Sequence, residues 1–315
     1  MSEQLFKTMR VVALPTRTNF RGVTTREVAL FRGAAGWSEF SPFLEYSPQE
    51  CLPWLESAIE AANTPPPQQL RSSIKVNATL PAINEESEVE RILGLFPGCK
   101  TVKVKVGANI VEDIARLKKV RTINPAIKIR IDVNGGWTVK DAVQNIRAIT
   151  DAIGGLEYVE QPVETIEELK DLKVALNGEV RITGDEILRK AADPFAINLN
   201  EAVDIVMLKV APLGGITRSL KLAAHHKLPV VVSSALESAI GITTGLQLAA
   251  ALPTLEFDCG LATGSLLSSD VALHQINEGE IQVAIFEPNF DGLLVSPERH
   301  KWWQDRVMKT WELIA

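Results

Sequence analysis

The chain has 315 residues, of which 46% are apolar and 23% are charged. These values are typical of a globular protein and exclude a disordered chain, a collagen-like repeat and a disulfide scaffold. Its 33 Lys and Arg against 39 Asp and Glu give a net charge of −6. Because such a chain lacks the basic field that neutralises phosphates, we expect no nucleic-acid partner. The length allows about two domains, or one large barrel with an appendage.

The cysteines and the apolar stretches indicate the cellular compartment of the protein. Cys51, Cys99 and Cys259 are odd in number and show no C-x-x-C spacing, which predicts reduced thiols in a cytosolic protein. The N-terminus MSEQLFKTMR has no apolar region of a signal peptide, and no stretch reaches the roughly 18 apolar residues of a membrane span. We expect a cytoplasmic protein without membrane association, and the oligomeric state stays open.

The N-terminal part of the chain differs in pattern from the rest. Residues 1–72 combine short extended runs, such as VVALPTRTNF and REVALF, with one helical segment, PQECLPWLESAIEAAN, which the three prolines of residues 65–67 end. This mixture predicts a small α+β capping domain whose boundary lies at residue 72, although an ordinary loop gives the same proline pattern. We expect residues 286–315, which include Trp302 and Trp303, to pack on this domain as a helix.

Residues 73–285 alternate between β-branched runs and helical segments, which is typical of βα units and a parallel sheet. We expect eight strands: IKVNATL, KTVKVKV, IKIRIDV, GLEYVE, EVRITG, VDIVMLK, LPVVVSS and TLEFDCG. Eight units favour a closed, TIM-like (β/α) barrel over a doubly wound sheet, because no G-x-G-x-x-G follows the first strand.

Charged residues recur once in each βα unit. Successive strand residues face opposite sides, so the valines of KTVKVKV and the isoleucines of IKIRIDV suit the helix-covered outside and leave the charged residues inside. The second to sixth strands then each end in an inward charge: Lys105, Asp132, Glu160, Asp185 and Lys209. Their spacings of 27, 28, 25 and 24 residues each equal one unit. These groups should converge at the barrel mouth, where TIM-barrel active sites are built.

Three of the converging groups are carboxylates, and they repel one another unless a positive group balances them. A divalent cation with a preference for oxygen ligands meets that need. Because no His or Cys stands at these positions, we expect Mg²⁺ or Mn²⁺ rather than zinc. We assign Asp132, Glu160 and Asp185 as the metal ligands.

Lys105 and Lys209 should face each other across this metal. Burial and the neighbouring charge of Lys103 lower the pKa of a lysine toward neutrality, which a general base needs near pH 7. A metal that binds a substrate carboxylate, with a lysine on each side, indicates abstraction of the proton α to that carboxylate. The metal and the ammonium groups would stabilise the resulting enediolate. We therefore expect a small-molecule substrate that carries a carboxylate.

Five stretches resemble the metal and lysine motifs of the enolase superfamily, muconate-lactonising-enzyme subgroup. In chain order they are TVKVKVG, RIDVNGGW, YVEQP, ITGDEILR and DIVMLKVAPLGGI. Three further stretches, RGVTTREVALFRGAAGWSEFSPFLEY, VVVSSALESAIG and FDCGLATG, are similar to the o-succinylbenzoate synthases of the short actinobacterial type. The resemblance covers nearly the whole chain and is weakest in about the last 40 residues.

This resemblance implies the dehydration of 2-succinyl-6-hydroxy-2,4-cyclohexadiene-1-carboxylate to 2-succinylbenzoate, a step in menaquinone biosynthesis. It implies that Lys105 removes the α-proton and then protonates the departing hydroxyl in a syn elimination, whereas Lys209 stays charged and stabilises the enediolate. Lys103 should hold the substrate carboxylate, and Asn134 and Glu186 should orient the metal site.

The succinyl arm of such a substrate needs polar donors. Ser233 and Ser234, with their backbone amides, follow the seventh strand and are binding candidates. Gly260, after the eighth strand, would let a ligand approach the backbone closely, although a turn glycine gives the same pattern. Arg21 lies in a polar loop, residues 18–25, that resembles the lid of these barrels. It either meets a substrate carboxylate or is an ordinary surface arginine.

Other functions stay open. N-acylamino-acid racemases of the same subgroup share the five charged groups and use the lysine at the position of Lys209 as a second base. Dipeptide epimerases carry a D-x-D element after the eighth strand, which CGLATGS lacks. A noncatalytic carboxylate-binding barrel is the alternative of another class, and loss of the lysines or carboxylates would favour it. A Schiff-base aldolase built on Lys209 would leave the three carboxylates unexplained.

Overall fold

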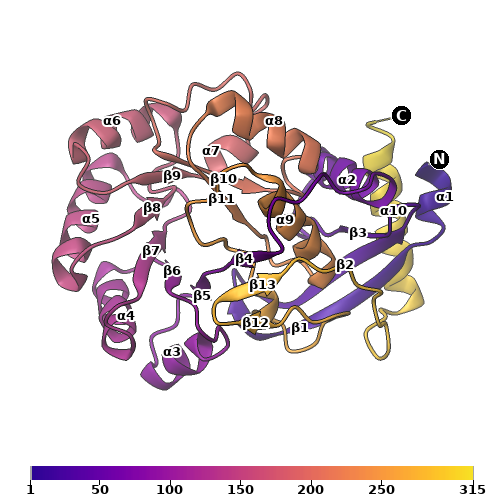
Figure 1. Cartoon of the computed structure of the whole chain (residues 1–315), viewed down its shortest axis with the longest axis horizontal. Coiled ribbons are helices and arrows are strands. Elements are labelled where there is room, and N and C mark those ends of the chain that lie inside the picture. Colours follow the sequence, from indigo (N-terminus) through magenta and orange to yellow (C-terminus); the bar gives the residue numbers. More distant parts are fainter. Residues whose placement is uncertain (1, 315) are drawn as a thin grey trace.

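The computed structural model describes residues 2–314 and shows two parts of different architecture (Figure 1). A small antiparallel sheet with helices lies at one end of the molecule, beside both termini. A curled parallel sheet surrounded by helices forms the rest. The fold is a parallel (β/α) barrel with a smaller capping domain, as the sequence predicts.

The cap is built on an antiparallel sheet with the order β1-β2-β3. Its elements are α1 (Ser2–Phe6), β1 (Arg10–Phe20), β2 (Val23–Arg32), β3 (Trp37–Phe40) and α2 (Pro48–Asn63). Helix α2 matches the predicted helix, and Ser47 and Glu50 form a capping box at its start. The turn between β1 and β2 consists of Arg21 and Gly22, both with positive φ, which is the backbone that a two-residue hairpin requires.

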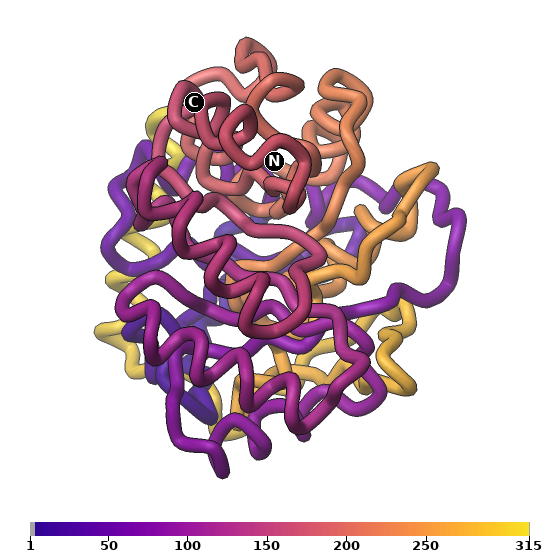
Figure 2. Tube along the Cα trace, turned by 90° about the vertical axis from the view of Figure 1, so that its left-hand side faces the viewer, coloured from indigo at the N-terminus to yellow at the C-terminus, as the bar shows by residue number. Residues whose placement is uncertain are grey.

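The barrel sheet is parallel, with the strand order β11-β10-β9-β8-β7-β6-β5. Its strands are β5 (Ala78–Leu80), β6 (Thr101–Lys105), β7 (Lys128–Asp132), β8 (Tyr158–Glu160), β9 (Ile182–Gly184), β10 (Ile205–Lys209) and β11 (Val230–Ser233). Its helices are α3 (Glu86–Leu93), α4 (Ile110–Ile123), α5 (Val139–Ile153), α6 (Ile166–Leu176), α7 (Glu186–Arg189), α8 (Ile216–His226) and α9 (Ala239–Ala251). Figure 2 shows the helices that follow the middle strands lying in a row over the outside of the sheet.

The first and eighth predicted strands are shorter than the sequence suggests. IKVNATL divides into β4 (Ser73–Lys75), which pairs with β13 (Glu280–Gln282) beside β12 (Ile276–Asn277), and β5, which pairs with β6. The eighth strand is reduced to parallel bridges from Cys259 to Val76 and from Gly260 to Ser233. It ends there because the chain turns into the 3-10 helix η1 (Thr263–Leu266). These two bridges still join the sheet edges and close the barrel.

Apolar side chains fill the barrel from both faces. Strand valines and isoleucines pack against the helices outside, as the alternation predicts. A separate interior cluster occupies the half of the barrel that precedes the charged strand ends: Tyr158, Ile205, Met207, Val231 and Phe257. This apolar plug lies below the charged strand ends, and the buried Arg130, which pairs with Glu157, packs against its Tyr158 ring at 4.7 Å from the centroid. Within residues 2–314, no helix combines the length and apolarity needed to cross a membrane.

The C-terminal helix α10 (Pro297–Trp311) packs on the cap. Trp303 is buried against Phe40 of β3, with ring centroids 6.0 Å apart, and its Nε1 donates to Glu27 Oε2 at 2.8 Å. These contacts suit a capping domain completed by the C-terminal segment. The division at residues 72 and 285 stays a prediction.

Replacing Trp303 by Ala should therefore lower the free energy of unfolding by about 3–5 kcal/mol, because it empties a fully buried site shared by helix and cap. The neighbouring Trp302 is 39% exposed, and Trp302→Ala should cost less than about 1 kcal/mol. Urea unfolding followed by circular dichroism measures both. Equal losses would contradict the packing of α10 described above.

Candidate active site

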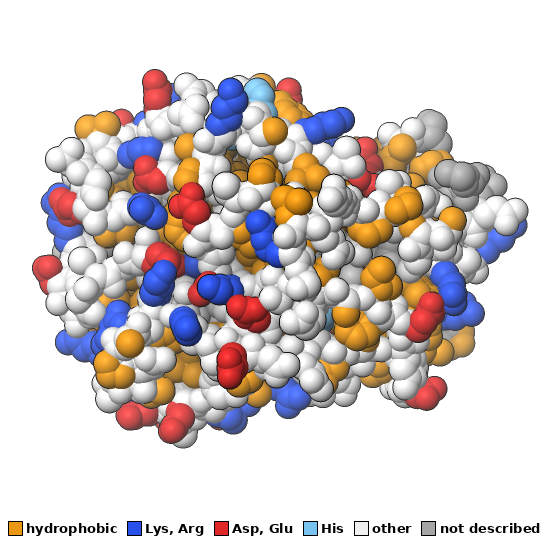
Figure 3. Space-filling model, viewed as in Figure 1, with side chains coloured by type: hydrophobic (Ala, Val, Ile, Leu, Met, Phe, Trp, Pro, Cys, Tyr) orange, Lys and Arg blue, Asp and Glu red, His pale blue; other side chains and the backbone are white. Residues whose placement is uncertain are grey.

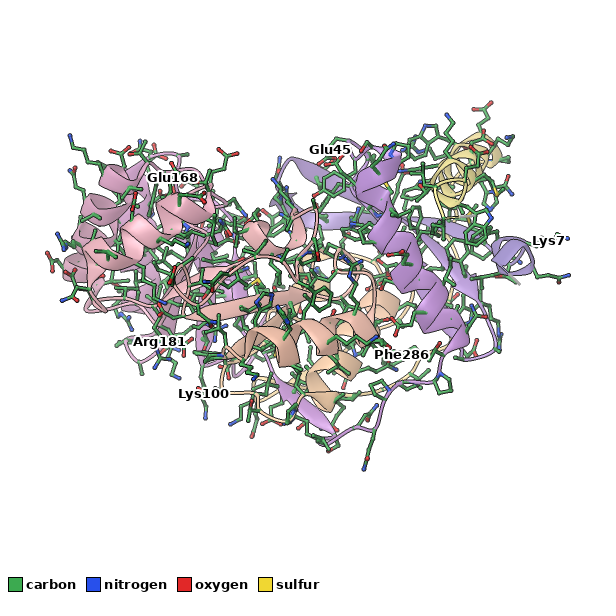
Figure 4. All side chains as sticks on the ribbon, turned by 90° about the horizontal axis from the view of Figure 1, so that it is seen from above. Lys7, Glu45, Lys100, Glu168, Arg181 and Phe286 are labelled. Atoms are coloured by element: carbon green, nitrogen blue, oxygen red, sulfur yellow. The ribbon has the colours of Figure 1, made fainter. Side chains whose placement is uncertain are left out.

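The carboxyl ends of the barrel strands face the cap. Figure 4 shows Lys100 and Arg181, which precede β6 and β9, along one edge of the molecule and Glu45 of the cap at the opposite edge. Phe43 and Tyr46, on either side of Glu45, line a pocket together with Lys105 at the end of β6. The pocket therefore lies between the cap and the mouth of the barrel.

Strand register brings the predicted charged residues together. Lys105 pairs with Asp132 across β6 and β7, and Asp132 pairs with Glu160 across β7 and β8. Asp185 directly follows β9, and Lys209 ends β10. Because the strands are parallel and nearly in step, one charge per strand forms a ring at the mouth.

Ion pairs join the lysines to the carboxylates in this ring. Lys103 Nζ lies 2.8 Å from Glu160 Oε2 and 3.3 Å from Asp132 Oδ2. Lys105 Nζ lies 2.5 Å from Asp132 Oδ2, and Lys209 Nζ lies 2.6 Å from Asp185 Oδ2. All three carboxylates are almost fully buried. Three cations thus balance three anions in a site that water hardly reaches.

This charge pattern sets the pKa values of the acids. Burial opposes the ionisation of Asp132, but Lys105 and Lys103 outweigh it and hold the pKa of Asp132 well below its usual range. Asp185 has a lowered pKa because Lys209 and Arg189 likewise outweigh its burial. Burial, reinforced by repulsion from Asp132, raises the pKa of Glu160 to about 7. Glu160 is the least compensated of the three carboxylates.

The two lysines of β6 are shifted in opposite directions. Burial would lower the pKa of Lys103, but Glu160 and Asp132 outweigh it, so its pKa is raised. The pKa of Lys105 is lowered, chiefly by burial and also by the charge of Lys103, against the attraction of Asp132. Lys103 therefore holds its proton more firmly than Lys105, whose pKa is shifted in the direction that the sequence predicts.

The donor set suits a divalent cation. Asp132, Glu160 and Asp185 offer carboxylate oxygens from three adjacent strand ends, and Glu186 Oε2 is buried without a hydrogen-bond partner. In the described part of the chain, no three His, Cys, Asp or Glu side chains are arranged as a ready metal site, because lysines hold the carboxylates. The chemistry of oxygen ligands and the orphaned Glu186 oxygen fit Mg²⁺ or Mn²⁺ once the side chains turn toward it.

Asn134 and Glu186 connect the two halves of the ring. Lys105 Nζ donates to Asn134 Oδ1 at 2.7 Å, and Asn134 Nδ2 donates to Glu186 Oε1 at 3.1 Å. Arg189 Nη2 lies 2.7 Å from the same Glu186 oxygen, and its Nε lies 3.3 Å from Asp185 Oδ1. Arg189 also lines the pocket. Sequence reasoning missed it, although its place four residues after Asp185, on the next helical turn, is a readable signal.

The cap supplies an aromatic wall that sequence patterns did not single out. The rings of Phe43, Tyr46 and Trp54 pack edge to face, with centroids 5.6 to 6.4 Å apart, and all three line the pocket. Arg21, at the tip of the β1–β2 hairpin, lies 4.7 Å from the Phe43 ring centroid. Among the described residues Arg21 has no ion-pair partner, so its guanidinium is free to meet an anion at the pocket.

The serines and the glycine predicted after the last strands lie beside one another. Ser233 and Ser234 line the pocket. Ser234 Oγ donates to Gly260 O at 2.6 Å and lies 2.7 Å from Thr263 Oγ1. Gly260 itself is not among the pocket-lining residues. A Cβ there would lie 2.4 Å from Ser233 Oγ, so the glycine allows close packing against Ser233.

Comparison with known proteins agrees with this architecture. Residues 89–290 match the model described as "Enolase C-terminal domain-like", and residues 11–62 match "Enolase N-terminal domain-like". The muconate lactonizing enzyme from Pseudomonas fluorescens superposes with a TM-score of 0.73 at 19% identity, covering 93% of this chain and 97% of that one. The L-Ala-D/L-Glu epimerase from Bacillus subtilis gives 0.73 at 23% identity, with coverages of 91% and 98%. These structures share the fold.

Relatives of higher sequence identity define the protein family more closely than these structures do. The o-succinylbenzoate synthase of Mycolicibacterium smegmatis is 47% identical over 99% of this chain and 98% of its own length. Those of Mycobacterium leprae and Mycobacterium tuberculosis are 46% and 47% identical, over 99% of this chain and 94% and 96% of their own lengths. The chain therefore belongs to the enolase superfamily and, within it, to the family of these synthases.

Asp132→Asn should weaken Mn²⁺ binding by about tenfold or more, because it removes a charged oxygen from the three carboxylates that the site offers to a cation. Glu164→Gln, which alters an exposed carboxylate, is the matched control and should leave binding unchanged. Titration calorimetry with MnCl₂ measures both affinities. Equal affinity in the wild type and in Asp132→Asn would remove Asp132 from the ligand set.

Proposed function

We propose that this protein is an o-succinylbenzoate synthase, a hydro-lyase of menaquinone biosynthesis that converts 2-succinyl-6-hydroxy-2,4-cyclohexadiene-1-carboxylate to 2-succinylbenzoate. One observation carries the proposal: near-full-length identity to such synthases coincides with an intact ring of Lys105, Asp132, Glu160, Asp185 and Lys209. No observation favours the racemase, the aldolase or the noncatalytic barrel.

Lys105 is the group that moves protons. Its neutral amine takes the proton from the carbon that bears the carboxylate, and the C–H electron pair moves toward the carboxylate. The same ammonium then gives its proton to the hydroxyl on the neighbouring ring carbon, so that the C–O bond breaks and water leaves. One group serves both steps because the two leaving groups lie on the same face of the ring. The lowered pKa of Lys105 suits this double role.

The remaining charged groups stabilise the negative charge that develops on the substrate carboxylate. Lys103 and Lys209 present ammonium groups from β6 and β10, on different sides of the pocket. Members of this superfamily depend on a divalent metal, and we propose Mg²⁺ or Mn²⁺ held by Asp132, Glu160 and Asp185 with support from Asn134 and Glu186. Such an ion would supply further positive charge for the carboxylate oxygens.

The succinyl arm extends away from the reacting carbon. Ser233 and Ser234 offer hydroxyl groups on one wall of the pocket, and Arg21 lies at the tip of the cap hairpin. We assign the serines and Arg21 to the polar atoms of the arm, and the aromatic wall of Phe43 and Trp54 to its methylene groups. Gly260 contributes by letting Ser233 and Ser234 pack closely.

We also propose a cytoplasmic location without a nucleic-acid partner. All three cysteines are free and buried, which suits a reducing compartment. Lys, Arg, Asp and Glu side chains are interspersed over the face in Figure 3, and nucleic-acid binding favours a basic patch instead.

The first test of this function is Lys105→Ala. Removing the general base should lower kcat for dehydration by about 10²- to 10⁴-fold while the fold is kept. Product formation followed by its ultraviolet absorbance measures the rate, and circular dichroism monitors the fold. A near-normal kcat would overturn the assignment of Lys105.

Lys209 gives a second, independent test. Because Lys209 serves as a cation in dehydration, Lys209→Arg should keep much of the activity and Lys209→Ala should lose about 10²-fold or more. The same kinetic assay compares the two variants. Equal losses in both would indicate that Lys209 exchanges a proton, as a racemase requires.

A further inference from the structure

A carboxylate of the cap occupies the start of a barrel helix. Glu39, a buried residue of β3, accepts hydrogen bonds at Oε2 from Ser238 N at 3.1 Å, from Ser238 Oγ at 2.5 Å and from Gly241 N at 3.0 Å. Its Oε1 accepts from Ser41 Oγ at 2.5 Å. Helix α9 has no acidic residue in its own first turn, although a helix N-terminus favours negative charge. Glu39 brings a carboxylate to this position from 199 positions earlier in the chain.

The backbone of α9 leaves room for this carboxylate. A Cβ at Gly241 would lie 2.9 Å from Glu39 Cδ and 2.6 Å from Glu237 Cβ. Since real Cβ atoms do not approach other carbons so closely, a glycine at 241 is required by Glu39 and Glu237 together. The glycine at 241 thus allows the carboxylate of Glu39, in the cap, to pack directly against helix α9 of the barrel.

A second cap residue, Arg26, donates a hydrogen bond to the loop that precedes α9. Arg26 of β2 donates from Nε to Leu236 O at 3.1 Å and from Nη2 to Ser41 O. Its guanidinium lies 4.5 Å from the Phe43 ring centroid, on the aromatic wall of the pocket. Leu236 has a positive φ of 63°, so the loop takes a conformation that a leucine rarely adopts without outside support.

This loop, residues 233–238, contains the serines that are the proposed substrate contacts. Ser233, Ser234 and Ala235 line the active-site pocket, and a cavity of about 20 Å³ bounded by Glu39, Glu237 and these serines lies next to it. Ser238 stands only four positions after Ser234 on this short loop.

We propose that Glu39 is a positioning residue that sets the place of Ser233 and Ser234 through the start of α9. It thereby determines how tightly the succinyl arm is held. This inference rests on the proposed function for the identity of the substrate. The arm is remote from the reacting carbon, so its contacts act equally in the ground state and in the transition state and appear in KM rather than in kcat.

Glu39→Gln tests this role. The amide must turn its N–H₂ toward at least one of the N–H and O–H donors around it, which displaces the start of α9. Asp270→Asn is the matched control, because Asp270 Oδ2 accepts from Ala239 N at 2.8 Å at the same helix start but borders neither the active-site pocket nor the adjacent cavity that Glu39 lines. Both variants should lower Tm. Only Glu39→Gln should raise KM, by about tenfold, with kcat changed less than about twofold.

Hydrogen exchange gives a readout that does not depend on the substrate. Amides of residues 233–238 should exchange faster in Glu39→Gln than in the wild type. In Asp270→Asn the exchange rate of these amides should equal that of the wild type. An unchanged KM, an equal rise in both variants, or exchange that is no faster in this loop would overturn the inference. If the wild type forms no succinylbenzoate, the proposed function fails, and the exchange result still decides the role of Glu39.

A milder variant covers the case in which Glu39→Gln does not fold. Ser41→Ala removes one donor to Glu39 Oε1 and leaves the carboxylate in place. It should raise KM in the same direction by about two- to threefold, with kcat unchanged. A Ser41→Ala protein with wild-type KM and wild-type exchange in residues 233–238 would overturn the inference.

Discussion

Ionised groups can be buried at one end of a barrel only where each of them pairs with an opposite charge, and this constraint determines the arrangement of the whole site. Lys103, Lys105 and Lys209 balance Asp132, Glu160 and Asp185 among themselves. The apolar plug below them prevents water from solvating the ring from the other end. A divalent cation would add two positive charges to this neutral set, which favours an anionic substrate and a neutral Lys105. The same balance serves stability, binding and proton transfer.

The cap completes the site by closing the open side of the ring. Its aromatic wall excludes water from the pocket, and its hairpin tip presents Arg21. Glu39 fixes the cap to the start of α9, and Arg26 fixes it to the preceding loop. Motion of the cap as a whole would break these buried contacts. The β1–β2 turn, by contrast, leaves Arg21 and Gly22 exposed.

The barrel and its ring were predictable because both depend on regular periods. A strand reverses facing at every residue, and one charge recurs per βα unit, so Lys105, Asp132 and Glu160 could be placed at the mouth from spacing alone. The split of the first strand was not predictable, because antiparallel pairing of β4 with β13 depends on a partner about 200 residues away.

Tertiary contacts explain the other features that the sequence did not reveal. Phe43, Tyr46 and Trp54 resemble ordinary core residues until the cap is docked on the barrel. Glu39 resembles a surface residue of a short strand, and only the folded chain brings Ser238 and Gly241 to it. Arg189 carried a local signal in its spacing from Asp185, but its place in the pocket depends on the cap.

The measurement that tests this account most directly is the rate of 2-succinylbenzoate formation from the cyclohexadiene substrate with Mg²⁺ and with EDTA, beside an N-succinylamino-acid racemisation assay. The account predicts fast dehydration that EDTA abolishes and magnesium restores, with little racemisation. Racemisation without dehydration would contradict the assigned substrate and make Lys209 a second base. Dehydration that EDTA leaves unchanged would contradict the metal role of Asp132, Glu160 and Asp185.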